Sequence, residues 1–232
     1  MTSLGPFDAG PSLPEPLPES PFPLFQAWFD EAHERMDSPN PNAMTLATAG
    51  PGGRPSARVV LCKGINIEAG TIDFYTNLHS RKGREIEENP LVAVVFHWDT
   101  LERQVRVEGR VSRVSDAEAD AYFATRAWQS RIGAWASAQS ESLTSRQALL
   151  EQAAARILEL DIDIAAAMRG DPVDIPRPPF WGGYRLEADW VELWMGGTGR
   201  MHDRAAWERV VDGGSGNEGS GAGGWRGQRL QP

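Results

Sequence analysis

Cysteine is nearly absent from the sequence, and Cys62 is the only one among 232 residues. A single thiol excludes an intrachain disulfide and a metal cluster built from cysteines, and it fits a reducing compartment. The sequence also lacks the run of about 18 apolar residues that a membrane-spanning helix requires. Its start, Met1 to Gly10, lacks the basic-then-apolar pattern of a secretory signal. We therefore expect a cytoplasmic protein without a membrane segment.

Positive charge is also in deficit, because 23 Lys and Arg residues stand against 32 Asp and Glu residues for a net charge of −9. This balance argues against a general binder of nucleic acid or acidic membranes, and no nucleic-acid partner is expected. The four histidines have no metal-ligand spacing, which predicts no metal site. No Gly-x-Ser-x-Gly elbow indicates a serine hydrolase. Basic residues that gather at one place therefore need a local explanation.

The chain divides into an N-terminal arm and one domain. Residues 1–23 hold seven of the 17 prolines and few large apolar residues, so this arm is expected to be extended or disordered. From 24 to 232 we expect a single domain with enough apolar residues for a core. It opens with a helix, because Leu24, Phe25, Trp28, Phe29, Ala32 and Met36 recur at helical spacing before the breaker at 38–41.

Short strand-like runs follow that helix at 43–49, 57–63, 71–76, 91–98 and 104–114, with turn signals between them. After two helical regions, from a capping box at 115–118 to about Arg126 and from 144 to 169, strands return at 181–186, 190–194, 205–211 and around Trp225. The short connections predict an antiparallel split β-barrel with flanking helices, a mainly β protein of the α+β class. The glycine-rich segment 213–224 is expected to be a flexible hairpin loop.

The run from Phe74 to Arg84 is the most informative for function. A strand-like segment stops there, and Arg81 and Lys82 fall in the first turn of an expected helix. A helix N-terminus carries partial positive charge, so cations are unfavourable there unless an anion lies between them and the free backbone N–H groups. A phosphate would fill that role.

Two further clusters carry phosphate-binding groups. Arg58 and Lys63 lie at the two ends of an apolar run, on opposite faces of a regular strand, so they serve one site only if a bend, a bulge or a second subunit intervenes. Tyr122, Arg126 and Ser130 follow at i, i+4 and i+8 and form one polar stripe if the helix continues that far. A solvated helix face explains the same spacing equally well.

The last cluster follows a glycine-rich bend after Trp194 and contains Arg200, His202, Asp203 and Arg204. Such a run is usually a surface patch of salt bridges. The tight turn beside an aromatic residue instead indicates side chains aimed at a ligand. Both interpretations remain open from the residues alone.

Taken in order, these segments resemble the pyridoxamine/pyridoxine 5′-phosphate oxidase family, flavoproteins with an FMN-binding split barrel, from about Asn42 to Pro232. Each motif is weak alone, and their order makes the resemblance specific. The motifs are Arg58 to Lys63, Tyr75-Thr76 with Ser80-Arg81-Lys82, Leu101 to Val105, Ile132 to Trp135, Gln139-Ser140, Phe180 to Arg185, Arg200 to Arg204 and Arg229 to Pro232.

The resemblance implies a homodimer with FMN at the interface, which would also remove the difficulty about Arg58 and Lys63. The implied FMN-binding residues are Arg58, Val59, Val60, Leu61, Cys62, Lys63, Tyr75, Thr76, Arg81, Lys82, Gln104, Gln139, Ser140, Trp194 and Arg204. The substrate phosphate would meet Lys63, Tyr122, Arg126 and Ser130. Arg200 and His202 would lie against the substrate ring as the catalytic pair.

The implied reaction is the oxidation of pyridoxamine or pyridoxine 5′-phosphate to pyridoxal 5′-phosphate, with O2 as acceptor and H2O2 as product. Two alternatives are a related split-barrel flavin oxidase acting on another ring compound and a non-catalytic protein that stores FMN or pyridoxal phosphate. The sequence departs from the family pattern in residues 1–23, which contain no Lys, Arg or Tyr to close over a substrate, and in the long segment 213–224.

Overall fold

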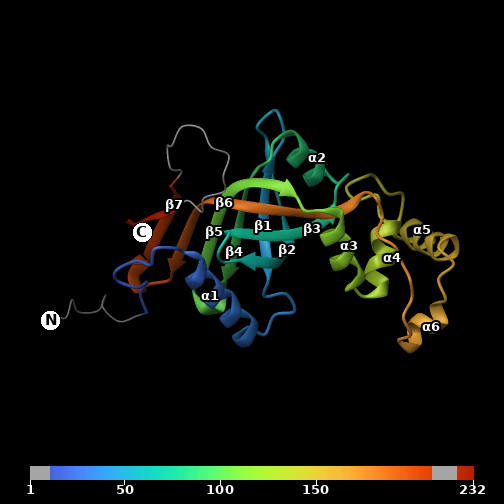
Figure 1. Ribbon diagram of the computed structural model, residues 1–232, viewed down its shortest axis with the longest axis horizontal. Helices are drawn as coiled ribbons and strands as arrows, with labels where there is room; N and C mark the ends of the chain where they lie inside the picture. Colours follow the sequence, from blue (N-terminus) through green and yellow to red (C-terminus); the bar gives the residue numbers. More distant parts are fainter. Residues whose placement is uncertain (1–10, 211–223) are drawn as a thin grey trace.

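Eight antiparallel strands form the centre of the computed structural model, which describes residues 11–210 and 224–232. Their order is β3-β2-β1-β4-β5-β6-β7-β8, and an additional β3–β6 pairing closes the first six into a barrel. β7 and β8 extend the sheet at one end of the molecule (Figure 1). The strands are β1 (Ala43–Ala49), β2 (Pro55–Asn66), β3 (Thr71–Asn77), β4 (Leu91–Trp98), β5 (Arg103–Arg113), β6 (Trp181–Met195), β7 (Asp203–Arg209) and β8 (Trp225–Leu230).

The helices lie in three places around the barrel (Figure 1). α1 (Phe22–Arg35) lies against its side, and α2 (Arg81–Glu88) follows β3. The remaining four form a helical layer at the end of the molecule opposite β7. They are α3 (Asp116–Ala124), α4 (Trp128–Ala136), α5 (Arg146–Glu159) and α6 (Ile164–Arg169), and the short 3-10 turns are η2 (Asp99–Leu101) and η3 (Thr198–Arg200).

The barrel core forms because apolar side chains alternate along the strands. In β4 every second residue from Val92 to Trp98 is buried, as the two-residue period of a strand requires. α1 adds one apolar face with Phe25 and Trp28. A smaller apolar cluster contains Phe123 and Trp181, and it joins the helical layer to the start of β6.

The predicted antiparallel barrel is confirmed, and the predicted bounds of β1 and β4 match the observed strands. The separate strands predicted at 181–186 and 190–194 are wrong, because β6 runs unbroken from Trp181 to Met195. Glu108 pairs with Trp190 while Gly109 pairs with Ala188, so Asp189 is the extra residue of a β-bulge. The bulge absorbs the charged, strand-disfavouring segment without ending the strand.

The predicted helices are in the right places, but their ends differ. α1 begins at Phe22 instead of Leu24 and accommodates a proline in its first turn, where the missing N–H has no helical partner. The region 144–169 is two helices, because Asp161 has a left-handed φ of 50° between them. The capping box of Ser115 and the helix stop at Gly170, which has a φ of 87°, are confirmed.

The described part of the N-terminal arm, residues 11–21, has no regular secondary structure but is docked on the C-terminal strands. Leu13 is only 1% exposed, and its backbone N–H donates to Asp203 Oδ2 at 2.7 Å. Pro18 O accepts a hydrogen bond of 2.9 Å from Trp207 Nε1, and Arg229 donates to Leu13 O at 3.2 Å. These residues are therefore an integral part of the fold. The rest of the arm, and the predicted loop except Gly224, lie outside the described residues.

Replacing Leu13 with Ala is expected to lower the free energy of unfolding by about 2 to 4 kcal/mol, because it removes a fully buried side chain and leaves a cavity. Urea denaturation measures this. The matched control is Leu158→Ala, at a position that is 81% exposed, and we expect it to change stability by less than about 0.5 kcal/mol. Equal small effects at the two positions would show that the docked arm contributes little.

Candidate functional site

A cavity of about 810 Å³ lies between the barrel and the helical layer. Four cations line it and no carboxylate does, although the chain has a net charge of −9. We call it the basic cavity. It brings together these predicted residues: Arg58, Val59, Val60, Leu61, Lys63, Tyr75, Thr76, Lys82, Tyr122, Arg126, Ser130 and Gln139.

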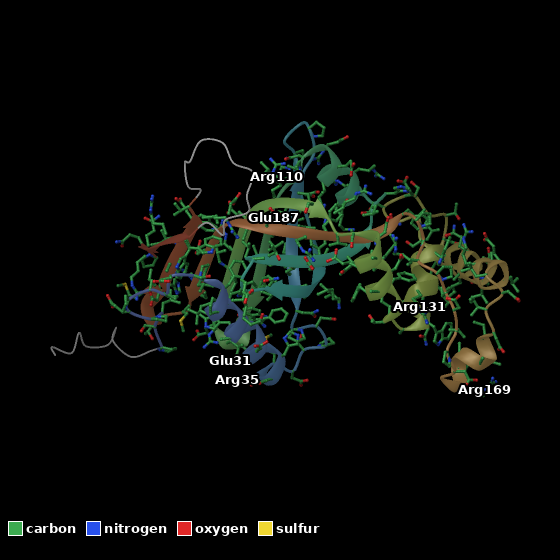
Figure 2. All side chains as sticks on the ribbon, viewed as in Figure 1. Glu31, Arg35, Arg110, Arg131, Arg169 and Glu187 are labelled. Carbon is green, nitrogen blue, oxygen red and sulfur yellow. The ribbon has the colours of Figure 1, made fainter. Side chains whose placement is uncertain are left out.

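Two other cavities in the described residues differ from it in charge. One, of about 810 Å³, is lined by Arg110 and Glu187 (Figure 2), and its Arg185 is paired with Asp73 at 2.7 Å. The other, of about 790 Å³ beside α5, has carboxylates as well as arginines in its lining. Of these three cavities in the described residues, the basic cavity alone presents positive charge without compensating acids, which is the property that an anion site needs.

A β-bulge in β2 brings Lys63 to the basic cavity. Cys62 pairs with Phe74 and Gly64 pairs with Asp73, so Lys63 is an extra residue between two register pairs. A bulge changes the direction of the side chains beside it. Lys63 and Arg58 both line the cavity within one chain. The bulge is therefore the explanation that the structure shows, and a second subunit is not needed to bring these two cations together.

The start of α2 contains the predicted cations, and a carboxylate in its second turn compensates one of them. Arg81 Nε lies 2.8 Å from Glu85 Oε1. Glu85 Oε2 also accepts from Thr48 Oγ1 at 2.5 Å and from Ser56 Oγ at 2.6 Å, and it lies 3.3 Å from Arg58 Nη2. Burial alone would raise the pKa of Glu85, but the hydrogen bonds from the two hydroxyls and from Arg81 lower it to about 2. Glu85 therefore stays ionised and holds both arginines.

Lys82 differs from Arg81, because its side chain is buried and all its partners are neutral. Its Nζ donates to Gln139 Oε1 at 2.6 Å, Thr76 Oγ1 at 3.0 Å and Ser80 Oγ at 3.2 Å. Lys82 is 8% exposed. Burial, and secondly the positive charge of Arg58, lower the pKa of Lys82 to about 8. An anion entering the cavity would stabilise this charge.

Three aromatic rings form one wall of the basic cavity. The centroids of Tyr75 and Tyr122 are 4.1 Å apart, and Trp181 lies 5.6 Å from Tyr75 with an interplanar angle of 12°. Gly183 pairs with Tyr75 across the β3–β6 ladder. A Cβ at Gly183 would stand 2.6 Å from the Tyr75 ring, so glycine is required for the ring to lie there.

Arg126 packs against this wall without a carboxylate partner among the described residues. Its guanidinium carbon is 4.8 Å from the centroid of Trp181 and 5.3 Å from that of Phe123. Its Nη1 is buried and has no hydrogen-bond partner. Burial lowers the pKa of the Arg126 guanidinium from its ordinary value. Of the four buried side-chain atoms without a partner among the described residues, this is the one whose residue lines the basic cavity, where a ligand atom could accept its hydrogen bond.

The helix does not continue as far as Ser130, which was the condition for Tyr122, Arg126 and Ser130 to form one polar stripe. α3 ends at Ala124 and α4 begins at Trp128. The chain turns because Thr125 bonds back to Tyr122 through both its N–H and its hydroxyl, at 3.1 and 2.8 Å. All three residues nevertheless line the basic cavity, so the break brings them together in place of the helical repeat.

A second group of predicted residues lies at the other end of β6. Gln104 pairs with Trp194, and Trp194 pairs with Arg204, across β5, β6 and β7. The rings of Trp194 and His202 are 4.7 Å apart. His202 Nδ1 accepts a backbone N–H at 3.1 Å, so a neutral ring carries its proton on Nε2. Arg200 follows the bend with a left-handed φ of 66°. None of these five residues lines the basic cavity of the same chain.

Three predicted residues, Arg81, Cys62 and Ser140, belong neither to the basic cavity nor to the group around Trp194. Arg81 is beside the basic cavity, and its backbone N–H donates to Ser140 Oγ at 3.1 Å, which fixes Ser140 at the start of α2. Cys62 is buried, and burial raises the pKa of its thiol to about 12. A thiol with so high a pKa is not a nucleophile at neutral pH. Direct cofactor contacts of these side chains remain predictions.

Sequence reasoning missed two residues that organise the basic cavity, Glu85 and Trp181. Glu85 had a signal, because a carboxylate four residues after Arg81 on a helix is an expected ion pair. Trp181 had none beyond its place in a motif, since its contact with Arg126 depends on packing between β6 and the helical layer. In the described residues, no helix is long and apolar enough to cross a membrane, and no group of His, Cys, Asp or Glu could hold a metal ion.

Comparison with known proteins identifies the family. Residues 29–160 match the family described as pyridoxamine 5′-phosphate oxidase, and residues 181–232 match the pyridoxine 5′-phosphate oxidase C-terminal dimerisation region. A protein of Rubrobacter xylanophilus named pyridoxine/pyridoxamine 5′-phosphate oxidase is 51% identical over 212 residues, which cover 91% of this chain and 87% of the relative. A protein of the same name from Cupriavidus metallidurans is 48% identical over 193 residues, covering 83% and 84%.

Solved structures agree on the fold. PhzG from Burkholderia lata, in complex with tetrahydrophenazine-1-carboxylic acid, matches with a TM-score of 0.76 and 30% identity over 93% of this chain and 94% of that one. An FMN-binding protein of Nostoc punctiforme, related to pyridoxamine 5′-phosphate oxidase, matches with a TM-score of 0.66 and 16% identity, which bears on the fold alone. With two matched regions that span most of its length and relatives about half identical to it, this chain belongs to the pyridoxamine 5′-phosphate oxidase family.

Proposed function

We propose that this protein is an FMN-dependent oxidase that converts pyridoxamine 5′-phosphate and pyridoxine 5′-phosphate to pyridoxal 5′-phosphate. The observation that carries the proposal is a pair of cations in one cavity without an acidic partner among the described residues, the buried Lys82 and the half-buried Arg126. A phosphate beside each of them would correspond to two phosphorylated ligands, a cofactor and a substrate. The names of the curated relatives support the same activity.

The residues at the start of α2 fit the phosphate of FMN. Lys82 supplies a buried charge, Thr76 and Gln139 surround it, and the helix N-terminus adds its partial positive charge. Glu85 holds Arg58 and Arg81 beside this place. When bound, FMN supplies the chemistry of hydride acceptance and of reaction with O2.

The residues of the helical layer fit the phosphate of the substrate. Arg126 offers an unused buried donor, and the hydroxyls of Tyr122 and Ser130 are at the same cavity. Lys63 Nζ lies 5.9 Å from the Tyr122 ring, on the same side of the cavity. In the proposed reaction the alcohol substrate and O2 give aldehyde and H2O2. The amine substrate also consumes water and releases ammonia.

A second copy of the chain would complete the site. Trp194, Arg200, His202 and Arg204 lie at the far end of β6 from the basic cavity, so one chain does not bring the two groups together. The match to a dimerisation region supports a homodimer in which each site takes one group from each subunit. Arg200 would then orient the substrate ring and stabilise negative charge beside it. His202, with Nδ1 already bonded, has Nε2 left for the substrate.

Purified protein reconstituted with FMN and given pyridoxine 5′-phosphate in air is expected to form pyridoxal 5′-phosphate and H2O2 in equal amounts. Absorbance of the aldehyde and a peroxidase-coupled assay measure the two products. Without oxygen, the same substrate should bleach the yellow flavin. A protein that holds flavin but neither bleaches nor turns over would overturn the proposal and favour storage of FMN or pyridoxal phosphate.

The second candidate is oxidation of another, unphosphorylated ring compound, and the similarity to PhzG favours it. The two candidates differ in their use of Arg126 and Lys63, the cations assigned to the substrate phosphate. If the preferred substrate has no phosphate, loss of Arg126 or Lys63 should hardly change its oxidation. A screen of phosphorylated and unphosphorylated ring compounds with the reconstituted protein separates them.

A further inference from the structure

Trp181 is held rigidly at the edge of the basic cavity. It is the first residue of β6 and is 6% exposed. Its backbone N–H donates to Pro178 O at 3.0 Å, and its carbonyl accepts from Arg177 Nη1 at 2.6 Å. Its ring meets Phe123 edge-on, with centroids 4.9 Å apart at 67°. The ring therefore has little freedom to reorient.

Arg126 depends on this ring for its position. It lies in the turn between α3 and α4, so no helix fixes its side chain. No carboxylate of the described residues pairs with it, and its guanidinium carbon lies 4.8 Å from the Trp181 centroid. The face of an indole attracts a guanidinium more strongly than the other aromatic rings do. Trp181, with a smaller contribution from Phe123 at 5.3 Å, thus supplies the attraction that an acidic partner would otherwise supply.

This way of holding an arginine leaves its donors free. A carboxylate would occupy the guanidinium N–H groups and would repel a phosphate, whereas a ring face takes none of them. The same ring lies nearly parallel to Tyr122, at 14° with centroids 6.1 Å apart, so it also limits where the phenol can point. Glu85 shows the contrast, because the arginines it holds have part of their donors occupied by an acid.

We propose that Trp181 is a positioning residue that gives the site its selectivity for a phosphorylated substrate, by holding Arg126 and Tyr122 with their phosphate donors unoccupied. This inference rests on the proposed function. It concerns binding of the phosphate group and not the oxidation itself.

The test is the ratio of dissociation constants of pyridoxal and pyridoxal 5′-phosphate, measured by calorimetry on FMN-loaded protein. We expect Trp181→Leu to lower this ratio about tenfold and Trp181→Phe, which keeps a ring, about two- to threefold. Trp28→Leu is the matched control. Trp28, on α1, is also buried, and the guanidinium carbon of Arg103 lies 4.9 Å from the centroid of its ring. It should lose stability and keep the ratio.

A double-mutant cycle tests whether Trp181 acts through Arg126. Once Arg126 is Gln, Trp181→Leu should change the ratio by no more than about two- to threefold, because only Tyr122 is left for the ring to position. If Trp181→Leu keeps the wild-type ratio while it binds FMN, the inference is overturned. If the wild-type protein itself shows no preference for the phosphorylated ligand, the substrate assignment fails first. The two failures are therefore distinguishable.

If Trp181→Leu does not bind FMN, Trp181→Phe takes its place in the comparison with wild type. An unchanged ratio of dissociation constants in Trp181→Phe then also overturns the inference.

Discussion

Replacing Lys82 with Met is expected to weaken FMN binding about 100-fold while making the apoprotein more stable. The Lys82 ammonium is buried among neutral oxygens, so a cofactor phosphate would be its first anionic partner. A hydrogen bond between charged groups contributes about 1.5 to 3 kcal/mol. Without the cofactor the buried charge is unfavourable, as its pKa of about 8 shows against an ordinary 10.5. Removing it should raise the free energy of unfolding of the apoprotein by about 1 to 3 kcal/mol.

The opposite signs of the two effects make this result hard to explain by misfolding. FMN affinity is measured by quenching of flavin fluorescence, and stability by urea denaturation of the flavin-free protein. Arg81→Ala is the matched control, because Arg81 is the neighbouring cation, with a side chain that is 53% exposed and already paired with Glu85. We expect it to weaken FMN binding less than about tenfold. Equal losses of FMN affinity at the two positions would show that burial of Lys82 does not set its contribution. A larger loss of substrate affinity than of FMN affinity would reverse the assignment of the two phosphates.

The depressed pKa of Lys82 also predicts how FMN affinity changes with pH. The second pKa of a phosphate monoester is about 6, so the cofactor is already doubly charged at pH 7. Above pH 8 the apoprotein loses the Lys82 proton, and FMN affinity should fall. Apoprotein stability should rise between about pH 8 and 10.5, because the unfolded chain still binds the proton that the folded chain has lost. Both pH dependences should be much smaller in Lys82→Met.

The barrel was predictable because its signals are local. Apolar alternation in β4 and turn residues between strands are visible in the sequence, and a capping box marks the start of α3. The two bulges were not predictable, since a register shift depends on which strand pairs with which. The bulge at Lys63 is a register shift inside the hairpin of β2 and β3, and the one at Asp189 comes from the pairing of β6 with β5, a strand distant in sequence. For the same reason β6 looked like two strands.

The candidate site was predictable as a set of residue types and less so as a geometry. Spacing left a polar stripe of Tyr122, Arg126 and Ser130 and a solvated helix face equally open, and it is a turn and not a helix that brings the three residues to one cavity. The sequence marks two cations at a helix start as unfavourable without an anion. In the structure this holds for Lys82, whose partners are neutral, whereas Arg81 is already paired with the carboxylate of Glu85. Charge compensation by a residue one turn away is a question that sequence can raise but only side-chain positions can answer.

Replacing Arg126 with Gln is expected to raise the KM for pyridoxine 5′-phosphate about 100-fold and to leave kcat within a few-fold of wild type. Arg126 would contact the phosphate equally in ground state and transition state, so its loss removes uniform binding. A charge-assisted contact of about 1.5 to 3 kcal/mol corresponds to a factor of about 10 to 150. Stability should hardly fall, because the substitution removes a half-buried guanidinium whose Nη1 is buried without a partner. Steady-state peroxide production measures both constants.

Arg131→Gln is the matched control for Arg126→Gln. Arg131 is on α4 of the helical layer (Figure 2), donates to Val173 O at 3.3 Å and also has a buried nitrogen, Nε, without a partner, but it does not line the basic cavity. We expect its KM to stay within twofold of wild type. Pyridoxine without a phosphate adds a second control, because Arg126→Gln should hardly change its slow oxidation. If Arg126→Gln impairs oxidation of the two substrates equally, Arg126 acts on the reacting ring or on the fold and not on the phosphate. If oxidation of neither substrate is impaired, Arg126 does not bind the substrate phosphate, and an unphosphorylated ring compound becomes the better candidate for the substrate.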